Sequence, residues 1–322
     1  MSSMFREVVT RQCGEPPSAV QGHAHTIGWS CDGRLAAGST GGWLVLYDLD
    51  ATSIARVKSS FAVSAKETVE SIAWHPSDKN QLAACFADRT MKVWDVRSPG
   101  APAQTYTSDG ENFSVTYSPD GHYIAMGSVR KDRGVETDIL GIYDLRTKKK
   151  LKSVKFNVMV NDYMWSPNGE YIINSCEKGQ IDILAFGGTK PLSRVKSMTT
   201  AHASGCQGMD IDPFHRYLAC GGLDGLVSLW ELGDFVCVRT IERCDVAIRA
   251  LSFSPDGRFL AIGMMDTPTD IAEVETGACA HVMDSGGGCT AVKFHPKRPI
   301  LAAISARPGR GDFGLRMWSF HY

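Results

Sequence analysis

A histidine held by a carboxylate can act as a general base, because the carboxylate fixes the imidazole tautomer and stabilises its charged form. The chain offers such a pair in His202 and Asp224, followed by Trp230. A second stretch keeps Asp88 and Trp94 without the histidine. Both sets occupy matching places in a repeated sequence unit, so we expect hydrogen-bonded networks inside the fold rather than a catalytic dyad.

The sequence lacks the short motifs of the common catalytic classes. It has no glycine-rich phosphate loop before a helix, no G-x-S-x-G nucleophile elbow and no H-E-x-x-H zinc motif. Its ten cysteines are scattered and never form C-x-x-C, which favours free thiols in a reducing compartment. We therefore expect no catalytic residue, no metal site, no cofactor and no enzymatic activity.

Basic residues are concentrated between residues 130 and 155. The densest part holds Lys148, Lys149, Lys150 and Lys152, which could form a phosphate-contacting patch for RNA or a nuclear-import segment. The alternative is that these lysines lie on a solvent-exposed strand at the edge of a sheet. We favour it because lysine on exposed strands commonly protects them against pairing with another chain. Any contact with RNA is thus expected to be weak or indirect.

Composition disfavours several other functions. The 322 residues carry a formal net charge of −1, so the chain has no global attraction to nucleic acid or to acidic membranes. No apolar stretch reaches the length needed to span a bilayer, and the N-terminal residues lack the apolar core of a secretory signal. We expect a protein of the cytosol or nucleus that does not act at a membrane.

A fold built from repeats must position these residues. One pattern, Leu or Ile followed by small and apolar residues, recurs seven times. Its copies begin at Leu35, Leu82, Ile124, Ile172, Leu218, Leu260 and Leu301. Their spacings of 47, 42, 48, 46, 42 and 41 residues lie near the roughly 40–45 residues typical of WD-type blades.

Further anchors accompany each copy. A large apolar or aromatic residue precedes it at a nearly constant distance, namely Trp29, Trp74, Tyr117, Trp165, Ile211, Phe253 and Phe294. Turns such as Ser118-Pro119-Asp120-Gly121 follow these anchors and are strong hairpin signals. The units predict an all-β, seven-bladed WD-repeat β-propeller, whereas a β-sandwich would require no period.

The last copy indicates how the ring closes. It reaches only a third strand, Gly314 to Phe320, so its blade lacks an outer strand. Residues 1–20 form the spare segment, in which Phe5 to Thr10 alternates plausibly as a strand. We expect this N-terminal strand to pair with the last blade and cover its edge, making residues 1–322 a single propeller domain.

Two insertions and one tryptophan are the candidate partner-binding features. Residues 129–137 and Ala306 to Phe313 replace tight turns between the second and third strands of blades three and seven. Such loops often bind partners, and neutral surface insertion is an equal alternative. Arg133 and Arg310 mark the insertions, and Trp43, beside two glycines in a predicted turn, is expected to be exposed as an interface anchor.

Several stretches carry a family resemblance. The segments GLVSLWELGDFVCVRT from residue 225, IRALSFSPDGRFLA from 248, DIAEVETG from 270 and FHPKRPILA from 294 resemble the WD-repeat subunit family of the THO complex, the third subunit in the usual count. The resemblance extends from about Gly22 to Trp318. DIAEVETG and HPKRPILA are its most specific parts, because they depart from the general repeat consensus.

The resemblance implies a nuclear, non-enzymatic scaffold or adaptor that supports assembly of a complex acting in messenger-RNA processing and export. Its expected partners are the large helical scaffold subunits of the THO complex, with a DEAD-box RNA helicase associated indirectly. A chromatin or histone-tail reader that uses the narrow face of the propeller is the alternative function.

Overall fold

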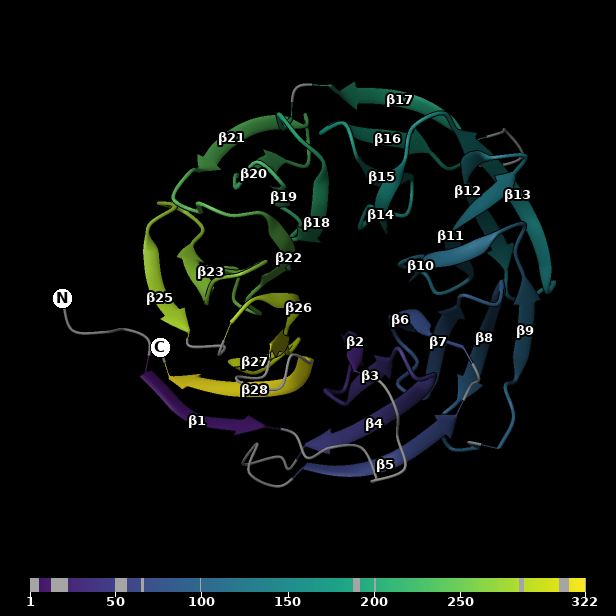
Figure 1. The fold of residues 1–322 in the computed structure, drawn as a ribbon, viewed down its shortest axis with the longest axis horizontal. Coiled ribbons are helices and arrows are strands. Elements are labelled where there is room, and N and C mark those ends of the chain that lie inside the picture. The colour runs from purple at the N-terminus through teal and green to yellow at the C-terminus, as the bar shows by residue number, and fades with distance from the viewer. Residues whose placement is uncertain are drawn as a thin grey trace.

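A computed structural model describes residues 6–12, 23–49, 57–64, 67–98, 100–187, 192–199, 201–283, 287–306 and 313–321. Seven four-stranded antiparallel sheets stand as blades around a central opening, which confirms the predicted seven-bladed propeller (Figure 1). All regular elements in these ranges are strands. No helix there is long and apolar enough to cross a bilayer.

Each blade consists of four strands, from the innermost strand at the channel to the outermost strand at the rim. Blade one consists of β2 (Ala24–Trp29), β3 (Leu35–Ser39), β4 (Trp43–Leu49) and β5 (Val57–Ser64), and blade two of β6 (Val69–Trp74), β7 (Gln81–Phe86), β8 (Thr90–Asp95) and β9 (Gln104–Thr107). Blade three consists of β10 (Glu111–Tyr117), β11 (Tyr123–Asp132), β12 (Val135–Asp144) and β13 (Lys149–Phe156), and blade four of β14 (Val160–Trp165), β15 (Tyr171–Cys176), β16 (Ile181–Ala185) and β17 (Ser193–Met198). Blade five consists of β18 (Cys206–Ile211), β19 (Tyr217–Gly222), β20 (Val227–Glu231) and β21 (Val236–Ile241), and blade six of β22 (Ile248–Phe253), β23 (Phe259–Met264), β24 (Thr269–Glu273) and β25 (Cys279–Met283). Blade seven consists of β26 (Cys289–Phe294), β27 (Ile300–Ala306), β28 (Phe313–His321) and β1 (Arg6–Gln12).

The second strand of each blade carries the repeated Leu-Ala pattern because it is covered on both sides. In β3 all five residues are buried. A Cβ added at Gly38 of this strand would lie 2.5 Å from a methyl group of Val69 in blade two. Small residues are therefore needed where neighbouring blades approach most closely.

The hydrophobic core lies between blades. Each of the seven apolar clusters combines side chains from two neighbouring blades, including the pair formed by blades seven and one. One cluster joins Leu44 and Leu46 of blade one to Trp74 and Leu82 of blade two. No blade can bury its apolar faces alone, so we expect the ring to fold as one cooperative unit.

The expected closure is confirmed. The N-terminal strand β1 pairs antiparallel with β28, from Arg6 opposite His321 to Gln12 opposite Arg316. Figure 1 shows β1 along the outer edge of the last blade, beside β28. The strand begins one residue after and ends two residues after the predicted Phe5 to Thr10 segment.

The prediction of a long loop at residues 129–137 is wrong. The second and third strands of blade three simply continue, so β11 and β12 form a ladder that extends to the Asp132–Val135 pair. Only Arg133 and Gly134 connect them, with φ values of 49° and 83°. Both lie in the left-handed region that two-residue hairpins require, so the insertion is a β-ribbon and not a loop.

Candidate functional site

The propeller has two faces that differ in their connections. The upper face, as we define it, carries the turns between second and third strands and the links from blade to blade. These two kinds of connection are hydrogen-bonded together in several blades, as where Leu223 N donates to Gly205 O at 2.8 Å and Met265 N to Ala247 O at 3.0 Å. The lower face carries the turns between first and second strands and between third and fourth strands.

The candidate partner-binding residues lie toward the upper face where they are described. Trp43 is not in a turn: it is the first residue of β4, pairs with Ser64 and is half-buried, which corrects the expectation of an exposed ring. Arg133 is exposed at the tip of the β11–β12 ribbon. Arg310, with most of the insertion between Ala306 and Phe313, lies outside the described residues.

Within the part of the chain that the structure describes, four large apolar side chains are exposed on the upper face. Val135 of the ribbon is 63% exposed, and Met159, Leu223 and Met265 are exposed on blades three to six or on the links between them. Single exposed apolar residues are common, and these four are spread over several blades, so they are candidate contact positions and not one continuous patch.

The upper face also has a ring of residues around the mouth of the channel. In every blade the pairing of the innermost strand with its neighbour skips one residue, which forms a β-bulge. The skipped residues, here called the bulge ring, are His25, Glu70, Phe113, Asn161, Gln207, Arg249 and Thr290.

Many bulge-ring side chains reach the next blade. His25 Nε2 lies 3.4 Å from Glu70 Oε2, and Arg249 Nη1 donates to Gln207 Oε1 at 3.2 Å. Asn161 Nδ2 donates to the carbonyl oxygen of Cys206 at 2.7 Å. The bulges therefore turn side chains sideways, where they connect blades across the rim of the channel.

The channel holds carboxylates, but each has a partner in the protein. It has a volume of about 350 Å³, with Glu70 and Asp162 among its lining residues. Asp162 accepts from Ser114 Oγ at 3.1 Å, and burial raises the pKa of its carboxyl group. Below it, Asp210 lies 3.4 Å from Lys293 Nζ. These contacts give the channel acids a structural role that connects inner strands.

In blade five the structure brings together the predicted network residues. His202 Nδ1 lies 3.0 Å from Asp224 Oδ1, and His202 Nε2 lies 2.8 Å from Ser228 Oγ. Trp230 Nε1 donates to the same Ser228 Oγ at 2.8 Å. Ser228 was missed in the sequence, although it links the histidine to the tryptophan. The histidine side chain is fully buried, which favours a structural role over proton transfer to a substrate.

A possible metal-binding group overlaps this network. Within the described ranges, the ligand atoms of His202, Cys206 and Cys220 lie within 4.8 Å of one another. Both ring nitrogens of His202 are already engaged by Asp224 and Ser228, so a metal would have to displace one of these partners. Burial also raises the pKa of the Cys220 thiol well above its usual value, which disfavours the thiolate that a metal requires.

Blade two does not contain the equivalent network. Asp88 accepts from the backbone N–H of Thr90 at 2.9 Å, within its own turn. Trp94 is buried against Phe86, with ring centres 6.0 Å apart, and its indole N–H has no hydrogen-bond partner among the described atoms. Trp94 thus stabilises blade two by packing alone.

The four lysines of the basic segment do not form one patch. Lys150 is ion-paired with Asp109, and Lys152 Nζ is buried 4.8 Å from the ring centre of Phe186. Burial lowers the pKa of Lys152. Lys148 and Lys149 remain exposed at the turn into β13.

On the lower face, one side chain closes the first turn of each blade. It directly follows the anchor residue and accepts backbone N–H groups of the turn. Serine fills this position in four blades, as where Ser118 Oγ accepts from Tyr123 N at 2.9 Å. His75 and His295 use Nδ1, and Asp212 uses a carboxylate oxygen. Different residues therefore perform one structural task.

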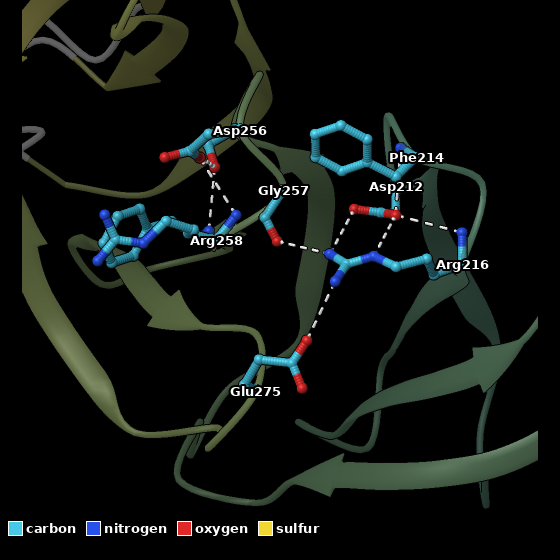
Figure 2. A network of polar contacts seen from close by, with 9 residues as sticks. Asp212, Phe214, Arg216, Asp256, Gly257, Arg258 and Glu275 are labelled. Atoms are coloured by element: carbon cyan, nitrogen blue, oxygen red, sulfur yellow. Dashed lines mark hydrogen bonds and ion pairs between the residues drawn. The ribbon is translucent and has the colours of Figure 1, made fainter.

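Where histidine or aspartate closes the first turn of a blade, its side chain also lies against the glycine in the first turn of the next blade. A Cβ at Gly33 would lie 2.2 Å from His295 Nε2, and Gly33 has a φ of 94°. Figure 2 shows the third case, in which Arg216 lies between Asp212, the carbonyl oxygen of Gly257 and Glu275. Arg216 Nε is 2.9 Å from Asp212 Oδ2, and the Asp212 side chain is fully buried. This arginine therefore connects blades five and six.

Two grooves open on the lower face. The first, of about 340 Å³, lies between blades three and four and includes Tyr123, Trp165 and Phe186 in its walls. The second, of about 560 Å³, lies between blades four and five and includes Tyr171, Leu232 and Phe235. Pro167 and Asn168 border both grooves, so the two are neighbours across the first turn of blade four.

We expect acid to destabilise the fold through His295. Burial, reinforced by Arg298 and Lys297, lowers the pKa of His295 to about 4. The folded state therefore favours neutral imidazole, and its contribution is present above about pH 6.5 and is lost as the pH falls towards 4. The free energy of unfolding should be about 2 kcal/mol lower at pH 5 than at pH 7.5 from this residue.

Urea unfolding between pH 7.5 and 5 measures this effect. His295→Asn keeps a side-chain acceptor for the turn but removes the titrating group, so it should flatten the dependence on pH. His122→Asn, on an exposed side chain, is the matched control and should leave the dependence unchanged. Equal slopes for the wild type and His295→Asn would contradict the assignment.

Comparison with known proteins extends these observations. The family model described as "Eukaryotic translation initiation factor eIF2A" matches residues 21–184. The models for the "Anaphase-promoting complex subunit 4 WD40 domain" and for "WD domain, G-beta repeat" match residues 215–297 and 193–231. Among solved structures, the β-propeller domain of Myceliophteria thermophila Cps50 (Swd1) aligns with a TM-score of 0.78 at 14% identity, covering 97% of this chain and 99% of that chain. This likeness shows the propeller fold alone.

Two curated relatives are more similar in sequence. "THO complex subunit 3" of Arabidopsis thaliana is 32% identical over 286 residues, which cover 88% of this chain and 87% of that protein. "WD repeat-containing protein AAC3" of Dictyostelium discoideum is 32% identical over 258 residues, covering 79% of this chain and about half, 52%, of the relative. The first relationship extends over nearly the full length of both proteins.

Proposed function

Because this chain belongs to the family of THO complex subunit 3, we propose that it is a non-enzymatic scaffold subunit of a nuclear THO complex. In this role it supports assembly of the complex and, through it, messenger-RNA processing and export. Its direct partners are the large helical scaffold subunits, and a DEAD-box RNA helicase associates through them. The relationship to a THO subunit over 88% of the chain is the observation that carries the proposal.

The upper face is our candidate for the scaffold-binding surface. Its exposed apolar residues stand on a ring whose inner strands are connected from blade to blade, so binding requires little ordering of the propeller. The near-zero net charge favours recognition by apolar anchors within a polar rim. Arg133 and Val135 place one such anchor at the tip of the β11–β12 ribbon.

RNA is at most a weak direct ligand in this proposal. Lys150 is exposed but paired with Asp109, which offsets its charge, and the ammonium group of Lys152 is buried. Lys148 and Lys149 alone would neutralise few phosphates, and affinity for single strands scales with the number of such contacts.

Co-expression with the scaffold subunits tests the proposed role. We expect wild-type protein to co-purify with them in moderate salt, and the double substitution Val135→Glu with Met159→Glu to lower recovery at least tenfold, because buried anchors typically contribute more than about 1 kcal/mol each. Val195→Glu, on an equally exposed valine of the outer strand β17, is the control and should bind normally.

Two results would count against the proposal in different ways. If wild-type protein recovers histones but no THO subunit, the THO role is wrong and the chromatin-reader alternative is favoured. If the wild-type complex forms and the upper-face double variant binds as well as Val195→Glu, the role stands and the assignment of the face is wrong.

A further inference from the structure

The two grooves on the lower face have walls that suit a long aliphatic or aromatic side chain. Trp165 and Phe186 meet edge to face, with ring centres 4.9 Å apart, and Tyr123 packs against Phe186 at 5.2 Å. These three rings line the first groove. Volumes of about 340 and 560 Å³ are sufficient for several side chains of a bound segment.

Carboxylates are the charged groups at both grooves. Asp120 lines the first groove and Glu170 lines the second, whereas neither lining includes a lysine or arginine among the described residues. Asp120 accepts from Ser118 and from the backbone N–H of His122, and Glu170 accepts from Asn168 Nδ2 at 2.7 Å. These partners belong to the same turns, and both acids remain exposed to solvent.

Two lysines lie near the grooves, each against an aromatic ring of a groove wall. Lys152 Nζ is buried against Phe186, which forms part of the wall of the first groove. Lys196 Nζ lies 5.7 Å from the ring centre of Phe235 and donates to the carbonyl oxygen of Asp234 at 2.5 Å. His122 is 3.4 Å from Asp120, on an exposed side chain. Asp120 and Glu170 are exposed and have no lysine or arginine partner among the described residues, so a cation of a bound segment can reach both, at Asp120 in competition with His122.

We propose that the two lower-face grooves form a second docking site, which binds a basic and apolar segment of a protein partner. The aliphatic stems of lysine or arginine, or neighbouring Leu, Met or aromatic side chains, lie between the aromatic walls. Their cationic ends contact Asp120 and Glu170. This site goes beyond the proposed scaffold function, because it lies on the face opposite the upper-face surface.

Phe214 provides an anchor beside the second groove. It is 61% exposed and directly precedes His215, which lines that groove. The guanidinium of Arg216 lies 5.6 Å from its ring centre, and Arg216 is itself held by the buried Asp212. In Figure 2 the ring of Phe214 stands above this ion pair. An exposed ring above a fixed cation is pre-positioned for a partner, which lowers the entropic cost of binding.

The test is selection of random short peptides displayed on phage against the full-length chain. We expect the selected peptides to combine Lys or Arg with Leu, Met or aromatic residues. Glu170→Lys combined with Asp120→Asn should weaken their binding at least tenfold, because one attraction is reversed and another removed. Phe214→Ala should also weaken binding.

These variants are chosen to preserve the fold. Asn168 occupies in blade four the turn position that Asp120 occupies in blade three, and it accepts from Ser166 Oγ at 2.6 Å, so asparagine keeps this turn. Glu242→Lys, on an exposed acid of the upper face, is the matched charge-reversal control and should bind as the wild type does. Thermal unfolding of each variant verifies that it is folded.

Three results would each overturn the docking site. The selection could yield acidic or uncharged peptides, or it could yield no peptide at all. The double variant could also bind the selected peptides as tightly as the wild type does. None of these results bears on the THO complex, whose recovery is measured separately with the upper-face variants. Conversely, loss of the THO complex by Val135→Glu with Met159→Glu should leave the selected peptides bound.

Discussion

Deletion of residues 1–12 is expected to lower the thermal unfolding midpoint by about 10 °C and to promote aggregation. The deletion removes β1, whose pairing with β28 covers the outer edge of blade seven. It exposes backbone N–H and C=O groups along a strand that carries the fully buried Trp318 and Phe320. Because every apolar cluster is shared between blades, weakening blade seven weakens the whole ring.

Calorimetry with size-exclusion chromatography measures both effects. Deletion of residues 1–5 is the control, since it leaves β1 intact and should change neither the midpoint nor the oligomeric state. A monomeric protein that lacks residues 1–12 and melts at the wild-type temperature would contradict a stabilising role for the closing strand.

Arg216→Ala should lower the free energy of unfolding by about 3 kcal/mol, because it leaves a buried carboxylate without its counter-ion. Asp212 is fully buried, and Arg216 also bonds the carbonyl oxygen of Gly257 and reaches Glu275 (Figure 2). Arg216→Lys should recover only part of the loss, because one ammonium group cannot make these separate contacts at once.

Arg258→Ala is the comparison for this measurement. Arg258 lies on the same face, is exposed, and rests on the ring of Phe259 at 5.2 Å, so its removal should change the free energy of unfolding by less than about 0.5 kcal/mol. Equal losses for the two alanine variants in chemical denaturation would show that Arg216 stabilises the fold no more than an ordinary exposed arginine does.

The fold could be predicted from the sequence because each blade repeats its signals. The Leu-Ala strand and the aromatic anchor recur with a period near that of WD-type blades, so seven weak indications reinforce one another. The closing strand was predictable for the same reason, since the last copy lacked one element that all the others had. Blades four and six, with Leu184 and Ala272 in place of the aromatic closing residue, were recovered from their other anchors.

Properties that differ between blades were harder to predict. The insertion at residues 129–137 predicts a loop because it replaces a tight turn, yet backbone pairing extends both strands and needs no apolar face. Trp43 stands after two glycines, which suggested a turn, but it pairs with Ser64 at the start of β4. The contact of Arg216 with Gly257 joins residues far apart in the chain, which no local pattern indicates.

The bulge ring was missed although the sequence contains a signal for it. Each member lies four residues before the anchor residue of its blade, as Glu70 does before Trp74 and Arg249 before Phe253. The side chains at this offset share no chemistry, so a search for similar residues passes over them. A search for the residue at a constant distance before each anchor, whatever its type, would have found the bulge ring.

The same bulges have a consequence for how such proteins diversify. A residue skipped by the strand pairing takes no part in setting register, so its side chain can be exchanged without shifting the residues on either side. The backbone can therefore stay fixed while these side chains vary, and only members that contact each other, such as His25 and Glu70, need to change together. Natural selection or protein engineering could therefore substitute the bulge-ring residues blade by blade. Such substitutions would change the binding specificity at the channel mouth and keep the same fold.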